Sequence, residues 1–389
     1  MEKFKLSRAV ESLEPSVTFE IDAKVKELQK KGVKVYNLNL GEPDFHTPDE
    51  VKTAAMEAIF RNETKYTAVQ GTLELREAIC GKFKRDNDLI YKPEEIIVSN
   101  GAKQALYLAV RTVCDVGDEI IILAPYWTSY PDIVRLAGGK PVIVRSEILR
   151  LLDVERVRKA ITPKTKAIIV NSPNNPTGAV YNYHELFELG MVTCRHNILV
   201  ISDEIYENFF YNSNNKPYSF ASIDPGLRDR TLTINGVSKT YAMTGWRIGY
   251  CAGPEYIIKK MTSLQSHVSS SACSVSQAAA VKALLGDQAL IREMVREFNM
   301  RKSFICGELL RAGIPHIQPE GAYYVFFRVE PKFNSIEFCR RMLDDFQVAL
   351  NPGDTFGTPG WVRLSYTVGL DDIKEAMRRI KALWTSKEK

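Results

Sequence analysis

The chain has 389 residues, of which 45% are hydrophobic and 25% charged, and its formal net charge is +5. Length and composition are ordinary for a soluble globular protein of two or three domains. The small charge excess, without a long run of lysine and arginine, argues against a nucleic-acid partner. No apolar run is long enough to span a membrane.

The cysteines, the histidines and the N-terminus bear on metal binding and location. The seven cysteines are an odd number with no C-x-x-C spacing, and the five histidines are scattered. This argues against a disulfide framework and against a metal site. Residues 1–10 alternate charged and apolar side chains, which is not the pattern of a secretory signal. We therefore expect a cytoplasmic protein with free thiols and no metal.

The N-terminal part of the chain predicts two helices joined by a loop. Apolar residues recur at helical spacing over residues 17–28, and Gly32 follows as a helix-ending residue. A second helix is predicted over residues 49–60. The stretch between them is rich in turn residues.

From residue 96 onward, short runs rich in valine and isoleucine alternate with helical stretches such as 103–113 and 184–195. Such alternation predicts an α/β domain, and continuous apolar runs are typical of buried parallel strands. The predicted strands are 96–98, 120–123, 141–144, 167–170, 199–201, 231–234 and 247–251.

The C-terminal third follows a different pattern. A long helix is predicted near 287–310, then strands at 323–327 and 361–366, and a final helix at 371–384. We expect a large domain over residues 49–286. A smaller α+β domain is expected over 287–389, joined by the N-terminal segment 1–48.

Polar clusters follow several predicted strands, and ligands of parallel sheets gather at that edge. Residues 99–106 form a small-residue turn that begins a helix, whose backbone N–H groups can hold a phosphate. Residues 171–178 form a dense Asn- and Pro-rich turn. Residues 202–206 place a carboxylate and a phenol three residues apart. Each has an ordinary structural alternative: a connecting turn, a tight loop, or a helix-capping aspartate.

Two basic residues stand in apolar surroundings. Lys239 follows the predicted strand 231–234 and precedes a glycine-containing stretch with Arg247, which suits a buried site. Arg363 lies within a predicted apolar strand, where a charge needs a partner from the protein or from a ligand. The alternatives are a solvated loop lysine and a structural ion pair.

Taken in order, these clusters resemble the class I aminotransferases, which bind pyridoxal phosphate in the fold-type I architecture. The resemblance runs from about residue 7 to residue 383 and also includes the motif at residues 37–45, Tyr66, and Tyr126-Trp127. It implies a large, mostly parallel sheet domain with a smaller α+β domain. It also implies pyridoxal 5'-phosphate as cofactor and amino acids and 2-oxo acids as substrates.

The resemblance assigns roles around the cofactor ring. Lys239 would hold the cofactor as a Schiff base and, once released, would move the proton between the substrate Cα and the cofactor. Asp203 would keep the pyridine nitrogen protonated. Tyr206 and Asn175 would donate hydrogen bonds to the ring oxygen, and Trp127 would stack on the ring.

The resemblance also assigns the two ends of the site. Arg363 would bind the substrate α-carboxylate as a planar fork, with the backbone N–H of Gly41 closing over it. Tyr66 would reach the phosphate from a neighbouring subunit, which implies a homodimer with sites at the interface. The residues implied for the phosphate within the chain are Arg247, the backbone of Gly101, Ala102 and Lys103, and the Ser238 hydroxyl.

Substrate choice depends on fewer residues. One branch of the family reads a second carboxylate with an arginine, and residues 265–277 hold none. The chain is similar to another branch at residues 15–18 and 101–104, and that resemblance implies Lys103 and Thr18 for the task. This favours transfer of the amino group of L-aspartate to 2-oxoglutarate. Relatives with the same frame accept aromatic or neutral amino acids or prephenate, and lyases of the same fold share the motifs. A non-catalytic cofactor-binding protein is the third alternative.

Two departures from the family pattern are visible. Residues 146–153 form a shorter strand-to-helix connection than usual. Gly236 stands where some relatives have a phosphate-binding serine, so the phosphate grip would depend more on Arg247.

Overall fold

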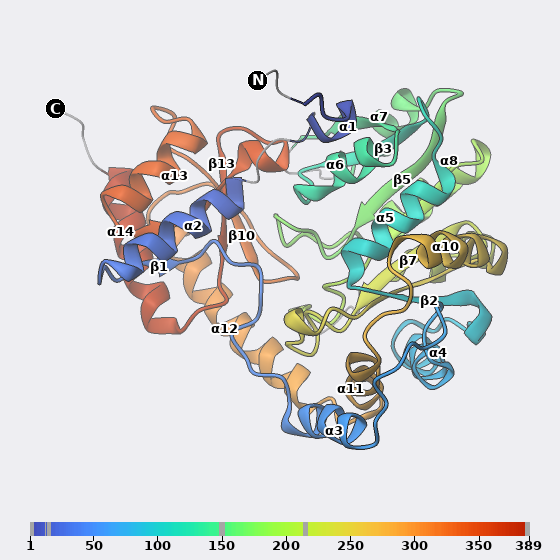
Figure 1. Ribbon diagram of the computed structural model, residues 1–389. Helices are drawn as coiled ribbons and strands as arrows, with labels where there is room; N and C mark the ends of the chain where they lie inside the picture. The colour runs from blue at the N-terminus through green and yellow to red at the C-terminus, as the bar shows by residue number, and fades with distance from the viewer. Residues whose placement is uncertain (1–3, 12, 14–16, 148–151, 213–216, 386–389) are drawn as a thin grey trace.

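A computed structural model describes residues 4–11, 13, 17–147, 152–212 and 217–385 (Figure 1). Its centre is a seven-stranded sheet of order β2-β8-β7-β6-β5-β3-β4. All neighbouring strands are parallel except at β8, which runs antiparallel to both β2 and β7. The strands are β2 (Ile96–Ser99), β3 (Glu119–Ala124), β4 (Lys140–Arg145), β5 (Thr165–Asn171), β6 (Leu199–Asp203), β7 (Thr231–Gly236) and β8 (Gly249–Ala252).

The expectation of a parallel strand over residues 247–251 is wrong in direction and in its start. The connection from β7 to β8 contains no crossover helix, only the short 3-10 turn Thr244–Trp246, and a parallel return needs a longer crossover. Arg247 lies outside the strand in a left-handed conformation, with φ 57°. The mostly parallel α/β sheet is otherwise confirmed.

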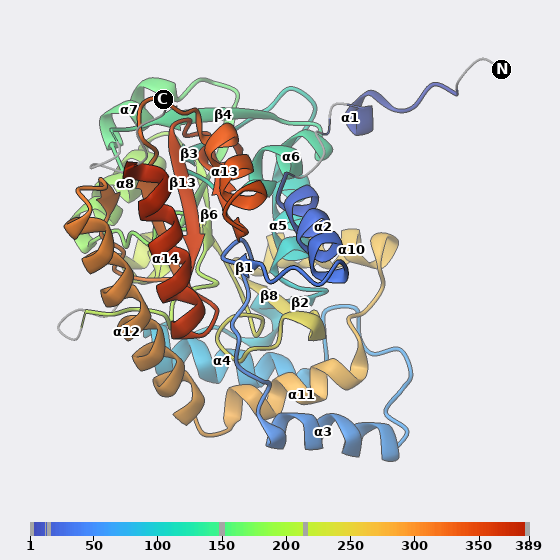
Figure 2. The same ribbon diagram turned by 90° about the vertical axis from the view of Figure 1, so that its left-hand side faces the viewer.

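Helices cover both faces of this sheet (Figures 1 and 2). Successive strand residues point to opposite faces, so Ile120 and Ile122 pack in one core cluster and Ile121 in another. The first cluster includes α5 (Ala102–Val113), α6 (Ser129–Leu136) and α10 (Glu255–Val268). The opposite face is covered by α4 (Leu73–Asn87), α7 (Val154–Ala160) and α8 (Tyr183–Arg195).

The C-terminal part builds a second core around a four-stranded sheet of order β12-β13-β10-β9. The long helix α12 (Ala289–Arg311) leads into it, and α13 (Ser335–Asp344) and α14 (Leu370–Thr385) pack against it. Its strands are β9 (His316–Ile317), β10 (Tyr324–Arg328), β12 (Asn351–Pro352) and β13 (Trp361–Ser365).

The N-terminal segment contacts this C-terminal part. Strand β1 (Tyr36–Asn37) pairs in parallel with β11 (Val348–Ala349), and Val25 of α2 (Val17–Lys30) packs against Leu343. The pairing supports the proposed grouping of residues 1–48 with 287–389, although the domain limits stay a prediction. Two further short helices are α1 (Arg8–Glu11) and α9 (Pro225–Arg228).

Helix α3 (Asp49–Phe60) packs against α11 (Ser274–Leu285) at one end of the molecule (Figure 1). Its other side leaves Met56, Ile59 and Phe60 exposed. No helix in the described ranges is both long and apolar enough to cross a membrane. The short connection expected at 146–153 falls partly outside the described residues, because 148–151 are not among them.

Candidate active site

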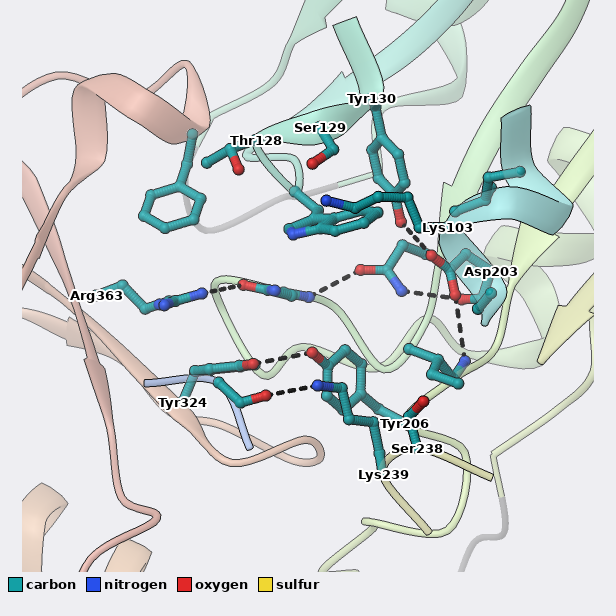
Figure 3. Close-up of a pocket in the computed structure, with 18 of the residues that line it drawn as sticks. Lys103, Thr128, Ser129, Tyr130, Asp203, Tyr206, Ser238, Lys239, Tyr324 and Arg363 are labelled. Carbon is teal, nitrogen blue, oxygen red and sulfur yellow. Dashed lines mark hydrogen bonds between the residues drawn. The ribbon is translucent and has the colours of Figure 1, made fainter. Parts of the chain in front are cut away.

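A cavity of about 490 Å³ opens at the carboxyl edge of the large sheet (Figure 3). Asp203 ends β6, Lys239 follows β7, and Arg363 enters from β13 of the second sheet. Eleven predicted site residues line it: Gly41, Ala102, Lys103, Trp127, Asn175, Asp203, Tyr206, Ser238, Lys239, Arg247 and Arg363.

Lys239 projects into the cavity, and the pKa of its amine is lowered there. Its Nζ donates a hydrogen bond to the carbonyl oxygen of Gly41 at 2.6 Å (Figure 3). Removal from water lowers the pKa of Lys239 to about 8, against the opposing charge of Glu42. A lowered pKa makes the neutral, nucleophilic amine available near neutral pH.

Asp203 is a buried carboxylate, 3% exposed, without an ion-pair partner among the described residues. Tyr130 donates to its Oδ2 at 2.7 Å, and the backbone N–H of Ile205 donates to its Oδ1 at 3.3 Å. Burial raises the pKa of Asp203 to about 6. A buried carboxylate of this kind is stabilised by a cation, so it fits the protonated nitrogen of a heterocyclic ring.

A cradle for an anion lies at the start of α5. Gly101, with φ 83°, precedes the helix, and a Cβ added there would lie 2.2 Å from Nη2 of Arg247. A Cβ on Gly249 would lie 2.2 Å from the backbone nitrogen of Ala102. Glycine at 249 lets the backbone of β8 lie against the start of the helix, while glycine at 101 lets the guanidinium approach the first N–H groups of the helix. Together they provide the donors and positive charge that a phosphate needs.

Gly236 ends β7 in a confined place. A Cβ there would lie 2.9 Å from the carbonyl oxygen of Ile248, so the backbone leaves little room for a side chain. This supports the expectation that a phosphate would depend on Arg247 rather than on a side chain at position 236.

Arg363 is buried, 5% exposed, and its partners are neutral. Its Nη1 donates to Oδ1 of Asn175 at 3.0 Å and its Nη2 to the carbonyl oxygen of Asn39 at 2.8 Å. Its Nε has no hydrogen-bond partner among the described residues. The structural ion pair considered as an alternative is therefore absent from the described part of the chain. A buried guanidinium without an anion fits a carboxylate ligand.

Lys103 provides a second cation on the other side of the cavity. Its Nζ lies 4.9 Å from the ring centroid of Trp127. Desolvation, and then the charge of Arg247, lowers the pKa of Lys103. Trp127 packs edge-on against Tyr130, with ring centroids 5.5 Å apart, which holds the indole at the cavity wall.

The turn that carries Asn175 is fixed by its own hydrogen bonds. Asn174 Oδ1 accepts from the Thr177 hydroxyl at 2.7 Å, and Asn171 Oδ1 accepts from the Asn175 backbone N–H at 2.8 Å. Asn171 also donates to the carbonyl oxygen of Asp203 at 2.9 Å. The turn and the end of β6 therefore hold each other in place.

Two predicted site residues lie elsewhere, and the side chain of a third is not described. Tyr66 is 92% exposed and does not line the cavity of its own chain. Gly101 packs behind Arg247 rather than facing the cavity. Thr18 belongs to α2, but its side chain is outside the described part of the structure.

The cavity also contains residues that the sequence did not single out. Tyr130 donates to Asp203, and Tyr324 lies 2.8 Å from Tyr206, oxygen to oxygen. Both are aromatic residues within or beside apolar runs, which is also the pattern of ordinary core residues. The one available signal was the spacing of Tyr130 three residues after Trp127 at the start of a helix.

The fold and the site together define a fold-type I α/β transferase. The family described as "Aminotransferase class I and II" matches residues 33–380. The chain belongs to this family and is an aminotransferase.

Relatives match over almost the whole chain. An aspartate aminotransferase of Bacillus subtilis is 45% identical, covering 97% of this chain and 98% of the relative. An aspartate/prephenate aminotransferase of Nitrosomonas europaea is 42% identical, covering 97% and 99%. The solved structure of an aspartate aminotransferase from Thermus thermophilus with maleate has a TM-score of 0.94 at 40% identity, covering 98% of this chain and all of that one.

Proposed function

We propose that the chain uses pyridoxal 5'-phosphate to transfer the amino group of L-aspartate to 2-oxoglutarate, giving oxaloacetate and L-glutamate. One observation carries the proposal: Lys239 shares its cavity with Arg363 and Lys103, two cations without a carboxylate partner among the described residues. Two cations suit the two carboxylates of an acidic amino acid. The names of several relatives support the same substrate.

When bound, pyridoxal phosphate supplies an aldehyde that links to amines and a ring that takes up the electron pair of the broken Cα–H bond. Asp203 would accept a hydrogen bond from the protonated ring nitrogen, which lowers the raised pKa of that carboxyl. Arg247 and the first N–H groups of α5 would hold the phosphate. Tyr206 and Asn175 would face the ring oxygen.

Lys239 would act twice. Its neutral Nζ would hold the cofactor through the aldehyde carbon and, once released by the substrate amine, would accept the proton from the substrate Cα. The Gly41 carbonyl, which accepts from Nζ at 2.6 Å, keeps the amine inside the cavity. The fit of the amine to both tasks depends on its lowered pKa.

The cations would orient the substrate. Arg363 would pair both oxygens of the α-carboxylate, while Lys103 would attract the side-chain carboxylate. Trp127 and Phe356 add aromatic surface to the lining of the same cavity. We include Thr18 as a further candidate for the side-chain carboxylate on the family resemblance alone.

The active unit would be a homodimer. The exposed apolar side chains Met56, Ile59 and Phe60 lie on α3, shortly before Tyr66. A surface of this kind is typical of a protein interface. Docking of a second copy there would bring Tyr66 to the phosphate of the partner's site.

The test is a half-reaction with purified, cofactor-loaded protein and L-aspartate, without an oxo acid. We expect the absorbance of the lysine-linked cofactor to disappear with about one oxaloacetate formed per site, the stoichiometry of a single transfer. Lys103→Met removes the charge but keeps side-chain length. It should slow the reaction of L-aspartate roughly 10- to 100-fold, because a screened charge pair contributes about 1–3 kcal/mol, and leave L-alanine unaffected.

Two other outcomes would redirect the assignment. If Lys103→Met slowed the half-reactions of L-aspartate and L-alanine equally, Lys103 would not be the residue that binds the side-chain carboxylate. Release of ammonia or pyruvate without an acceptor would favour a lyase. Amino transfer to prephenate is the second candidate function, favoured by the aspartate/prephenate name of the Nitrosomonas europaea relative, and prephenate as acceptor tests it directly.

A further inference from the structure

Tyr324 on β10 places a hydroxyl in the cavity that the proposed function does not use (Figure 3). It is 1% exposed, and its Oη lies 2.8 Å from Oη of Tyr206. The guanidinium of Arg363 lies 4.5 Å from its ring centroid. A Cβ on Gly41 would lie 2.8 Å from its hydroxyl oxygen. Tyr324 therefore packs against three residues expected to serve the cofactor and the substrate.

The hydrogen bond between the hydroxyls of Tyr206 and Tyr324 has a defined donor and acceptor once the ring oxygen is present. Each phenol carries one proton. If Tyr206 donates its proton to the ring oxygen, its own oxygen can only accept from Tyr324. A donor that itself accepts a hydrogen bond becomes polarised and donates more strongly. The proton of Tyr324 thus acts on the ring oxygen through Tyr206.

We propose that Tyr324 is a positioning residue that fixes the direction and strength of the hydrogen bond from Tyr206. The inference rests on the proposed function, because the acceptor is the cofactor ring oxygen. Burial supports the role, since Tyr206 and Tyr324 are only 5% and 1% exposed and water has little access to the hydrogen bond between them. The edge-to-face packing of the two rings, 5.7 Å between centroids, holds the hydroxyls together.

The test is a pH titration of the absorbance of the lysine-linked cofactor. Tyr324→Phe keeps the ring and removes the hydroxyl. The hydrogen bond from Tyr206 is then weaker and leaves more negative charge on the ring oxygen. That charge holds the proton on the nitrogen between Lys239 and the cofactor more tightly. We expect the titration midpoint to rise by roughly half a unit to one unit.

The matched control is Tyr366→Phe. Tyr366 is fully buried in the same aromatic core, and its hydroxyl lies 3.3 Å from the carbonyl oxygen of Ala322, outside the cavity lining. The control should titrate like the wild-type protein. An equal shift in both variants would indicate general loosening of the core and would overturn the proposal.

A double variant tests whether Tyr324 acts through Tyr206. Tyr206→Phe should itself raise the midpoint, and adding Tyr324→Phe to it should cause no further shift, because Tyr324 acts only through Tyr206. Additive shifts, or an unshifted Tyr324→Phe, would overturn the inference while leaving the function intact. A wild-type protein that binds no pyridoxal phosphate would instead refute the proposed function and this inference together.

Discussion

At the scale of single residues, the cavity contains buried charged groups that have no ion-pair partner among the described residues. Asp203 and Arg363 are each at most 5% exposed, and neither has an ion pair within the described ranges. Burying unpaired charges costs stability unless a ligand compensates. The protein therefore keeps these groups at the expense of its own stability, which is typical of a site built for a charged ligand.

The first prediction at this scale concerns Arg363→Lys. Lysine keeps the charge but loses the two parallel donors that match a carboxylate. We expect kcat/KM to fall roughly 100-fold, about 2.7 kcal/mol, for L-aspartate and L-alanine alike, because every amino acid has the α-carboxylate. Rates of the half-reaction measure it, with the bound-cofactor spectrum unchanged.

The control for Arg363→Lys is Arg328→Lys. Arg328 is an exposed residue at the end of the neighbouring strand β10, outside the cavity, so the same exchange there should leave the rates unchanged. A loss confined to L-aspartate in Arg363→Lys would mean that this residue reads the side-chain carboxylate instead.

How far the sequence predicts a residue depends on contrast with its surroundings. Lys239, Asp203 and Arg363 were recognisable because a charge beside an apolar strand is unusual. Tyr324 and Tyr130 were not, since a buried tyrosine in an apolar run is most often a core residue. The role of their hydroxyls depends on the hydrogen-bond partners that the fold places beside them, and the sequence does not show those partners.

At the scale of elements, the alternating apolar runs predicted the strands of the large sheet and their order in the chain. They did not predict the short strands β1, β9, β11 and β12, or every helix. Helix α11 is apolar on nearly all sides because it is buried between α3 and α4, so it has no helical periodicity to detect. The direction of β8 depended on the absence of a crossover helix, a long-range property that its own residues do not encode.

The end of β6 alternates its side chains between two environments. Asp203 and Tyr206 face the cavity, while Glu204 lies in a polar layer behind the sheet. Glu204 Oε1 accepts from the Ser202 hydroxyl at 2.7 Å and from the Ser219 hydroxyl at 3.0 Å. Burial, and then the charge of Glu207, raises the pKa of Glu204 to about 7.

This raised pKa predicts a pH-dependent stability. The pKa of about 7 in the folded state exceeds the ordinary value of 4.5 for a glutamate, so the folded state holds the proton more tightly than the unfolded state. Stability from this group is greatest below pH 4.5 and is lost as pH rises toward 7, by roughly 3 kcal/mol in all. Glu204→Gln, which stays neutral, should lose less stability over this range.

Urea unfolding of the cofactor-free protein at pH 5 and pH 8 measures the effect. Relative to the wild-type protein, Glu204→Gln should unfold at a higher urea concentration at pH 8 than it does at pH 5. Glu74→Gln changes an exposed carboxylate on α4 and should give no such change. An equal difference at both pH values for Glu204→Gln would show that Glu204 does not titrate on unfolding.

At the scale of the whole molecule, the cavity of one chain does not include every residue that is expected to serve the site. The cavity is lined by residues from both sheets and by Gly41 of the N-terminal segment, yet Tyr66 is 92% exposed. Exposed Phe60 and Ile59 near it would be covered by a second copy. A homodimer would therefore cover the apolar face of α3 and would bring the proposed phosphate ligand Tyr66 to the partner's site.

A hybrid dimer tests this arrangement. Tyr66→Phe should weaken cofactor binding roughly 10- to 100-fold, because a hydrogen bond to a charged group contributes about 1.5–3 kcal/mol. Lys239→Ala should be inactive. If Tyr66 serves the partner's site, a dimer of one Tyr66→Phe chain and one Lys239→Ala chain has a single complete site, since the intact Lys239 is paired with the intact Tyr66 of the other chain.

Co-expression with two affinity tags isolates this hybrid, and activity at limiting cofactor measures it. We expect about half the wild-type activity per dimer, well above both parent homodimers. Activity no higher than that of the Tyr66→Phe homodimer would place Tyr66 in its own chain's site or outside the site altogether. The exposed face of α3 would then need a different explanation, because covering it would no longer complete a phosphate site.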